Sequence, residues 1–246
     1  MITFYDLAAN GPKTWSPNPW KTRYILNYKQ LPYQTVYVEF PDIPRVSKEA
    51  GIGPSSFEPD GSPNFTIPAI VDDATGVALS DSYKIAEYLD KQYPDTPKAF
   101  PPGTEALQAA FYQNFYEQVR PLAVIFVPLI PNILNEPSAK YYNRTREVIF
   151  GKPLSQVMPV GEEFGKNWEK VTAMLDSLNN WYEKSSGKFL AGDQPSNGDF
   201  VVGGMFQGAR TVCGEESESW KKLEVLNGGR WTRLLDDLEK YADVSK

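Results

Sequence analysis

The chain has 246 residues, and 41% of them are hydrophobic, which is enough to fill one large core or two ordinary ones. Its formal net charge of -6 provides no excess of Lys and Arg for a nucleic acid or an anionic membrane, so neither is an expected partner. A single cysteine, Cys213, excludes an internal disulfide, and the absence of histidine removes the commonest metal ligand, so no metal site is expected.

The first residues, MITFYDLAAN, lack the basic and apolar regions of a secretory signal, which favours a cytoplasmic location. The longest apolar stretch, PLAVIFVPLIPNIL at 121–134, is interrupted by Pro128 and Pro131. It is also shorter than the roughly 20 apolar residues that span a bilayer. It therefore predicts a buried helix with a bend.

The first part of the chain predicts a small α/β domain. Residues 2–8 and 33–40 are rich in β-branched and aromatic residues and predict strands, while the segment between them has the apolar spacing of a helix. A strand, helix, strand unit implies parallel pairing of the two strands. The polar residues 44–63 predict a long irregular loop.

A hairpin and a helix complete this domain. The segments FTIPAIVDD and GVALS, which meet at the turn DATG, predict an antiparallel pair, and SDSYKIAEYLDKQY at 80–93 predicts a helix. The order β, α, β, loop, β, β, α over residues 1–93 resembles the topology of thioredoxin. The proline-rich residues 94–103 predict a linker.

Only helices are expected from residue 104 to residue 246. The clearest is amphipathic, with apolar residues spaced by four and three from Phe164 to Tyr182. Ser196 and Asp199 have the spacing of a capping box, and we assign them to folding. The fold class is therefore an α/β thioredoxin-like domain followed by an all-α domain.

Four features in this order carry a family resemblance: Ser16 at the start of the first helix, Pro68 within TIPAI, the SDS at 80–82 and the Ser196 to Asp199 cap. Together they make the chain resemble a glutathione S-transferase over nearly its full length. The segments SPNPWKTRYILNYKQLPY, PDGSPNFTIPAIVDD and SDSYKIAEYLDKQYPD most resemble the fungal class related to bacterial lignin β-etherases.

The resemblance implies that glutathione is the co-substrate and that its thiol must be held as the anion. The unperturbed pKa of a thiol is about 8.5, so little thiolate is present at neutral pH. A hydroxyl at a helix N-terminus can stabilise the anion, which implies a catalytic role for Ser16, with Asn18 as a second donor. A plain helix cap is the alternative for Ser16.

The rest of glutathione would be held by residues at the family's motif positions. A cis bond before Pro68 would turn the backbone of Ile67 toward the cysteinyl part, although a trans proline at a strand edge is the alternative. Asp81 would receive the γ-glutamyl ammonium, and Ser82 would receive its carboxylate at another helix start, where both are also suited to capping.

The glycyl carboxylate needs a cation from the polar loop, and Lys48 or Arg45 is available, although either can be a solvated surface charge. The second substrate, a small aromatic or hydrophobic electrophile, would lie between the domains. Aryl ethers and peroxides are further possible substrates, as expected of a detoxifying, xenobiotic-metabolising enzyme. The candidate pocket residues are Trp15, Tyr112, Phe115, Tyr116 and Phe126.

Two other residues bear on the chemistry. Redox members of the superfamily have a cysteine at the position of Ser16, whereas Cys213 lies far away in the helical half and is predicted to be a packed small residue. Tyr5 on the first strand is a minor catalytic alternative. A homodimer is expected, and two other functions stay open: a carrier of aromatic or polyphenolic metabolites of the ligandin type, and an interaction module.

Overall fold

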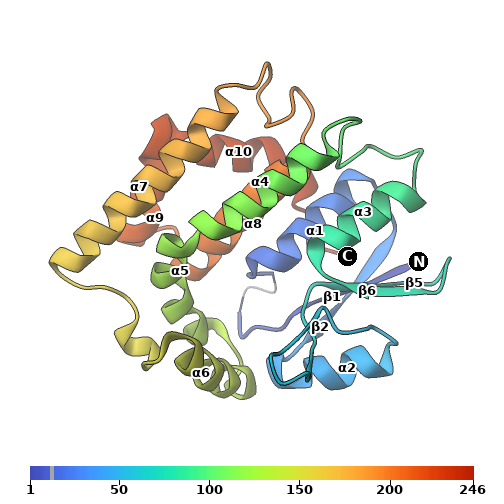
Figure 1. The fold of residues 1–246 in the computed structure, drawn as a ribbon, viewed down its shortest axis with the longest axis horizontal. Helices are drawn as coiled ribbons and strands as arrows, with labels where there is room; N and C mark the ends of the chain where they lie inside the picture. Colours follow the sequence, from blue (N-terminus) through green and yellow to red (C-terminus); the bar gives the residue numbers. More distant parts are fainter. Residues whose placement is uncertain (12–13) are drawn as a thin grey trace.

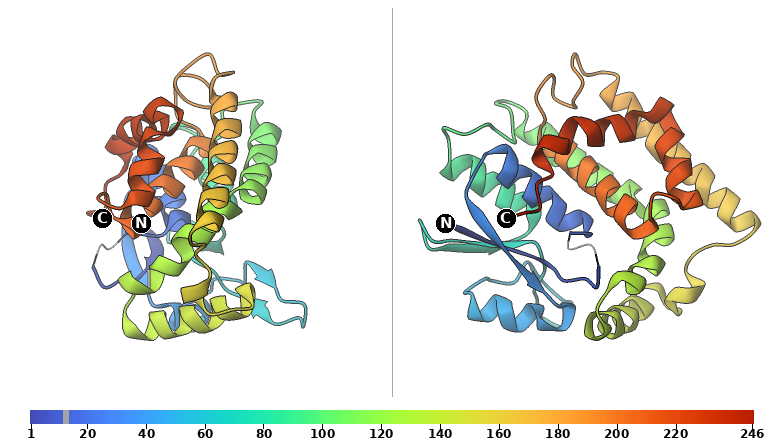
Figure 2. Two further views of the ribbon diagram at one scale, coloured as in Figure 1. Left: turned by 90° about the vertical axis from the view of Figure 1, so that its left-hand side faces the viewer. Right: turned by 180° about the vertical axis from the view of Figure 1, so that it is seen from behind.

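The computed structural model describes residues 1–11 and 14–246. The N-terminal part is a four-stranded sheet with helices on both faces, and Figures 1 and 2 show it beside a larger helical domain. Its elements are β1 Ile2–Leu7, α1 Pro17–Tyr28, β2 Tyr33–Val38, the 3-10 turn η1 Phe40–Asp42, α2 Ile43–Glu49, β3 Ser56–Phe57, β4 Pro63–Asn64, β5 Ala69–Asp72, β6 Val77–Ser80 and α3 Ser82–Gln92.

The sheet has the strand order β2-β1-β5-β6. β1 and β2 are parallel, with Ile2 opposite Tyr33, whereas β5 is antiparallel to both β1 and β6. The parallel first pair follows from the crossover through α1, and the antiparallel pair follows from the short turn before Gly76. The predicted thioredoxin-like α/β arrangement is confirmed.

The prediction of an irregular loop over 44–63 is wrong in part. This segment contains most of α2 and a separate two-stranded hairpin, β3–β4. Pro44 lies in the first helical turn, where a missing N–H costs no hydrogen bond. Helix α2 buries only Ile43 and Ser47, so its seven residues display no apolar repeat that the sequence could reveal.

The second part is helical, as predicted. Apart from one isolated bridge between Phe189 and Gly192, residues 104–246 contain no β-structure. The elements are α4 Glu105–Gln118, α5 Arg120–Phe126, η2 Val127–Ile133, α6 Glu136–Phe150, η3 Leu154–Gln156, α7 Glu162–Tyr182, α8 Asn197–Cys213, α9 Glu218–Val225, η4 Leu226–Gly229, α10 Arg230–Leu238 and η5 Glu239–Tyr241.

Two details of the helical part were also predicted, a bend and a capping box. The apolar stretch 121–134 bends between α5 and η2. Separately, in the described part of the chain no helix is both long and apolar enough to cross a membrane. At the start of α8 the backbone N–H and the hydroxyl of Ser196 both donate to the Asp199 carboxylate, each at 2.8 Å. The capping box therefore exists and is buried.

Helix α1 lies between the sheet and α8, so it joins the two domains (Figure 1). Two glycines of α8 permit this close approach. A Cβ at Gly208 would lie 2.7 Å from Pro17 Cγ, and one at Gly204 would lie 2.9 Å from the Pro17 carbonyl oxygen. The start of α1 therefore has its position fixed by the backbone of α8.

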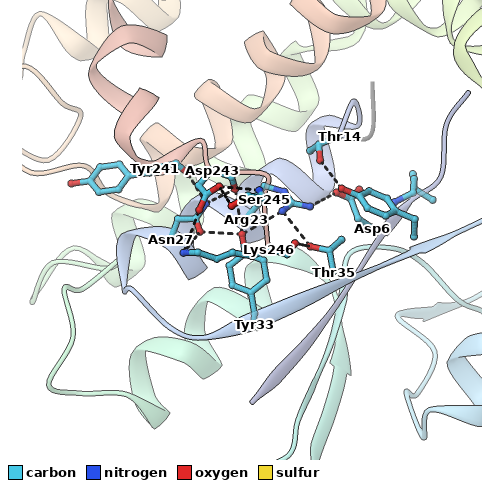
Figure 3. A network of polar contacts seen from close by, with 12 residues as sticks. Asp6, Thr14, Arg23, Asn27, Tyr33, Thr35, Tyr241, Asp243, Ser245 and Lys246 are labelled. Carbon is cyan, nitrogen blue, oxygen red and sulfur yellow. Dashed lines mark hydrogen bonds and ion pairs between the residues drawn. The ribbon is translucent and has the colours of Figure 1, made fainter. Parts of the chain in front are cut away.

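The end of the chain is bound to the N-terminal domain through the polar network of Figure 3. Arg23 of α1 donates to Asp6 of β1 at 2.9 Å, and both side chains are fully buried. Asn27 donates to the carbonyl oxygens of Tyr241 and Asp243, both at 2.9 Å. This network lies on the sheet side of α1 and joins β1, α1 and the C-terminal residues.

Candidate functional site

A cavity of about 540 Å³ lies where the two domains meet. The N-terminal domain contributes the end of β1, the start of α1, η1, α2 and residues 63–67, and the helical domain contributes η2 and α6. Ser16 and Asn18 both line it. The cavity therefore brings the two predicted catalytic residues to one surface.

Ser16 occupies the N-cap position of α1, but its hydroxyl does not cap the helix. Its backbone is extended, with φ -80° and ψ 131°, and only 4% of the residue is exposed. By contrast, the Ser217 hydroxyl at the start of α9 accepts from the Trp220 N–H at 3.1 Å. The Ser16 hydroxyl is thus available for a group in the cavity.

The first turn of α1 offers few backbone donors. Pro17 and Pro19 have no N–H, so of the first three helical positions only Asn18 can donate. The positive end of the helix dipole remains, yet a bound anion needs side-chain donors in addition. Ser16 and the Asn18 amide are the side chains of this turn that line the cavity and can donate.

Asn18 is oriented by two neighbours. Its Oδ1 accepts from Lys21 Nζ at 2.7 Å and from the Tyr116 hydroxyl at 3.0 Å. The Nδ2 hydrogens are therefore the donating end of the amide. Lys21 is only 3% exposed, and burial lowers its pKa to about 7, although the charge of Asp81 raises it.

The peptide bond between Ile67 and Pro68 is cis, as the resemblance implied, so the trans alternative is excluded. Ile67 lines the cavity. The Asp81 N–H donates to the Pro68 carbonyl at 3.3 Å, which links this bend to the start of α3.

Asp81 and Ser82 form the start of α3, outside the lining of the cavity. Asp81 has a φ of 84°, a conformation that non-glycine residues rarely adopt and that is frequent at functional sites. Its Oδ1 accepts from the N–H groups of Tyr83 and Lys84 at 2.9 and 3.1 Å, so Asp81 does cap the helix. The Ser82 hydroxyl lies 3.5 Å from the Tyr112 hydroxyl.

The two candidate cations of the polar loop differ. Arg45 is exposed and is paired with Asp42, the residue before its helix, at 3.2 Å and with Glu49 of the same helix at 3.0 Å. Lys48 has no such partner among the described residues, and its Nζ lies 5.7 Å from the ring centroid of Phe65, which lines the cavity. Lys48 is therefore the available cation of this pair.

The aromatic wall of the cavity differs from the predicted set. Trp15 lines it, but Tyr112, Phe115, Tyr116 and Phe126 do not. Phe115 is a core residue, Phe126 is half-buried at the end of α5, and the two tyrosines pack around Lys21 with its Nζ 5.7 and 4.5 Å from their ring centroids. Their role as pocket residues stays a prediction.

The other aromatic and charged residues that line the wall were missed. Phe40 contacts Trp15 and Tyr142, with ring centroids 6.2 and 5.4 Å apart, and Tyr141 and Arg146 of α6 also line the cavity. The only sequence signal was the i, i+4 spacing of Tyr142 and Arg146, which places both on one helix face. Which face meets the N-terminal domain depends on the packing of α6.

The two alternative catalytic residues, Tyr5 and Cys213, are poorly placed. Tyr5 is buried in β1 and does not line the cavity, and burial raises its pKa. Cys213 packs against the main core, and burial raises the pKa of its thiol to about 11, so its thiolate is disfavoured. The predicted packing role of Cys213 is confirmed.

Comparisons with known proteins agree with this geometry. The family profile described as glutathione S-transferase, N-terminal domain, matches residues 15–92, and the corresponding C-terminal domain profile matches residues 106–241. The chain is also 30% identical over 255 residues to the glutathione S-transferase-like protein ustS of Aspergillus flavus, covering 95% of this chain and 88% of the relative.

Solved structures of fungal proteins are similar over the whole chain. A glutathione S-transferase of Ceriporiopsis subvermispora in complex with glutathione is 44% identical, with a TM-score of 0.94 and coverage of 99% of this chain and 98% of the other. Glutathione transferase GSTFuA3 of Phanerochaete chrysosporium is 36% identical, with a TM-score of 0.93 and coverage of 100% and 98%. The chain belongs to the glutathione S-transferase family.

Proposed function

We propose that this protein is a glutathione transferase in which the Ser16 hydroxyl stabilises the thiolate of glutathione for attack on an aromatic or hydrophobic electrophile. One observation carries the proposal: a buried serine hydroxyl lines the interdomain cavity without capping its own helix. A similar protein from Ceriporiopsis subvermispora binds glutathione, which supports glutathione as the ligand here.

In the proposed binding mode, the three parts of glutathione contact three different segments of the N-terminal domain. The backbone of Ile67, beside the cis bond, pairs with the cysteinyl part of glutathione, and Lys48 binds the glycyl carboxylate. Asp81 keeps Oδ2 for the γ-glutamyl ammonium while Oδ1 caps α3, and Ser82 meets the γ-glutamyl carboxylate. Tyr112 and Tyr116 connect this end of the site to Asn18.

The proposed chemistry is nucleophilic displacement. The Ser16 hydroxyl and the Asn18 amide donate to the sulfur, the α1 dipole adds to their effect, and the pKa of the bound thiol falls. The thiolate then forms a C–S bond with the electrophilic carbon, and a leaving group departs with its bonding electrons. The thiol proton goes to solvent, so no histidine is required.

The test compares Ser16→Ala with Ser217→Ala, a serine that caps a helix and lies outside the cavity. We expect Ser16→Ala to raise the pKa of the bound thiol and to lower kcat/KM about 10- to 100-fold, because a hydrogen bond to an anion contributes about 1.5–3 kcal/mol. The affinity for glutathione should change little. The thiol pKa is measured from thiolate absorbance and the affinity by calorimetry.

Ser217→Ala should leave both quantities as in the wild type. If bound glutathione in the wild type titrates like free glutathione, the catalytic role of Ser16 is refuted. Tight binding of aromatic dyes without turnover of any electrophile would then support the carrier function. We also expect a homodimer, which analytical ultracentrifugation tests.

A further inference from the structure

Arg146 of α6 differs from every other described residue that lines the cavity, because it alone carries a charge. The remaining lining is aromatic, aliphatic or neutral polar. A cation at an apolar, aromatic surface is a common arrangement for binding an anionic group on a flat ligand.

The guanidinium of Arg146 has no carboxylate partner in the described parts of the chain. Its carbon Cζ lies 4.4 Å from the ring centroid of Tyr142, and its Nη1 donates to Thr145 Oγ1 at 3.1 Å. Stacking on Tyr142 fixes the plane of the guanidinium and leaves its other N–H groups to donate. The group is therefore held in place with most of its donors unused.

Arg146 and Ser16 lie at two ends of one aromatic surface. Trp15, next to Ser16, contacts Phe40; Phe40 contacts Tyr142; and Arg146 lies against Tyr142. A ring stacked on this wall can direct one substituent toward Ser16 and another toward Arg146. The position of the glutathione sulfur would then determine which carbon of the ring reacts, and Arg146 would determine which substituent the ring can have at its other end.

The carboxylates of glutathione have other candidate partners. Lys48 lies beside Phe65 at the N-terminal wall, and Ser82 lies at the start of α3. Arg146 belongs to the helical domain, on the side where the second substrate binds in the proposed function. This placement favours the second substrate as its ligand.

We propose that Arg146 selects a second substrate that is an aromatic electrophile bearing a carboxylate. The inference rests on the proposed transferase function. With 4-chloro-3,5-dinitrobenzoate as the acceptor, the glutathione sulfur forms a bond with C4, and the C4–Cl bond breaks. Chloride leaves with the bonding pair, the thiol proton goes to solvent, and the carboxylate stays bound to Arg146 throughout.

The experiment compares 4-chloro-3,5-dinitrobenzoate with 4-chloro-3,5-dinitrobenzamide, a neutral analogue with the same leaving group. We expect Arg146→Gln to lower kcat/KM for the carboxylate about 10-fold or more relative to the amide, because a charge-assisted hydrogen bond is lost. Arg146→Lys should restore part of this ratio. Arg144→Gln is the matched control, since Arg144 is exposed on the same helix and does not line the cavity.

Two kinetic outcomes would overturn the inference. One is an unchanged ratio between the two acceptors in Arg146→Gln. The other is a rise in the KM for glutathione that is equal with both acceptors, which would make Arg146 a ligand of a glutathione carboxylate instead.

A failure of the proposed function gives a different result, namely no turnover of either acceptor by the wild type. The inference is then tested by binding, through displacement of an aromatic fluorescent dye with 3,5-dinitrobenzoate and 3,5-dinitrobenzamide. Tighter binding of the benzoate in the wild type, lost in Arg146→Gln, supports the anion site. Equal affinities would refute it.

Discussion

Two cations of α1, Arg23 and Lys21, lie two residues apart and face different surroundings. Both are buried. Arg23, on the sheet side, pairs with Asp6 at 2.9 Å and also contacts Tyr33 and Thr35 (Figure 3). Lys21, on the side of the cavity, has no ion pair among the described residues; its Nζ donates to the amide oxygen of Asn18 and to the hydroxyl of Tyr116, beside the rings of Tyr112 and Tyr116.

This difference in pairing indicates that the charge of Arg23 is structural, whereas that of Lys21 is associated with the candidate site. A buried charge that is paired and hydrogen-bonded holds elements together, because the loss of either partner leaves the other desolvated. A buried charge without a counterion retains a desolvation cost, which is why the pKa of Lys21 falls to about 7. We infer that the cost at Lys21 persists because this residue orients Asn18.

The largest loss of stability should come from removing Arg23, the charge that is paired. Arg23→Met leaves Asp6 buried without its cation and should lower the free energy of unfolding by about 3–5 kcal/mol. Chemical denaturation measures this change. Arg144→Met, at an exposed arginine, should change stability by less than about 0.5 kcal/mol. A variant Arg23→Met as stable as this control would mean that the Asp6 pair is not structural.

A smaller loss should follow from displacing the helix that carries both charges. Gly208→Ala places a Cβ within 3 Å of Pro17 and should cost about 1–3 kcal/mol by overpacking, while lowering kcat/KM through movement of Ser16. Gly165→Ala in α7 has no atom within 4 Å of its new Cβ. It should stabilise the protein by about 0.5–1 kcal/mol. Equal changes in stability for the two variants would refute the claim that Gly208 is needed for the close approach of α8 to Pro17.

The unpaired charge of Lys21 should make the stability of the protein depend on pH. With the native pKa of Lys21 at about 7, below that of an ordinary lysine, the unfolded chain binds one more proton above pH 7. The free energy of unfolding of the wild type should therefore rise with pH above 7, relative to Lys21→Met, by up to about 1.4 kcal/mol per pH unit. The gain shrinks as pH falls toward 7, and below about 7, where Lys21 is protonated in both states, the dependence on pH disappears.

Denaturation of both proteins at a series of pH values from 6 to roughly 10, where an ordinary lysine titrates, provides the comparison. Parallel curves for the wild type and Lys21→Met would show that Lys21 stays protonated in the folded protein. Lys21→Met should also lower kcat/KM, since Asn18 loses one of its two orienting donors. An unchanged kcat/KM would contradict the orienting role.

The smallest changes in stability are expected for Ser16 and Ser217, the two serines at helix starts. Ser217→Ala should lower stability by about 1 kcal/mol, because its hydroxyl caps α9, whereas Ser16→Ala should cost much less because no cap bond is lost. Thermal unfolding of the two variants gives the comparison. A loss at Ser16 as large as at Ser217 would mean that Ser16 serves folding rather than a ligand.

Much of the fold was predictable from local patterns. The strands at β1 and β2, the long repeat of α7 and the capping box at Ser196 have periodicities or spacings that one segment displays by itself. The short helix α2 has too few buried residues to produce such a signal. The resemblance located Ser16, Asn18 and Ile67, which line one cavity.

The sequence by itself determined the longer helices and the main strands, and which motif residues lie at helix starts, because capping spacing and apolar periodicity act over a few residues; α2 and the β3–β4 hairpin escaped it. Only the tertiary structure decided that Phe40, Tyr142 and Arg146 line the same cavity as Ser16, and that Lys21 has no ion pair among the described residues where Arg23 has one. The physical reason is that burial and charge pairing depend on which face of each helix meets its neighbour. For α1 and α6 that face is set by packing between the domains, against α8 and η1 respectively.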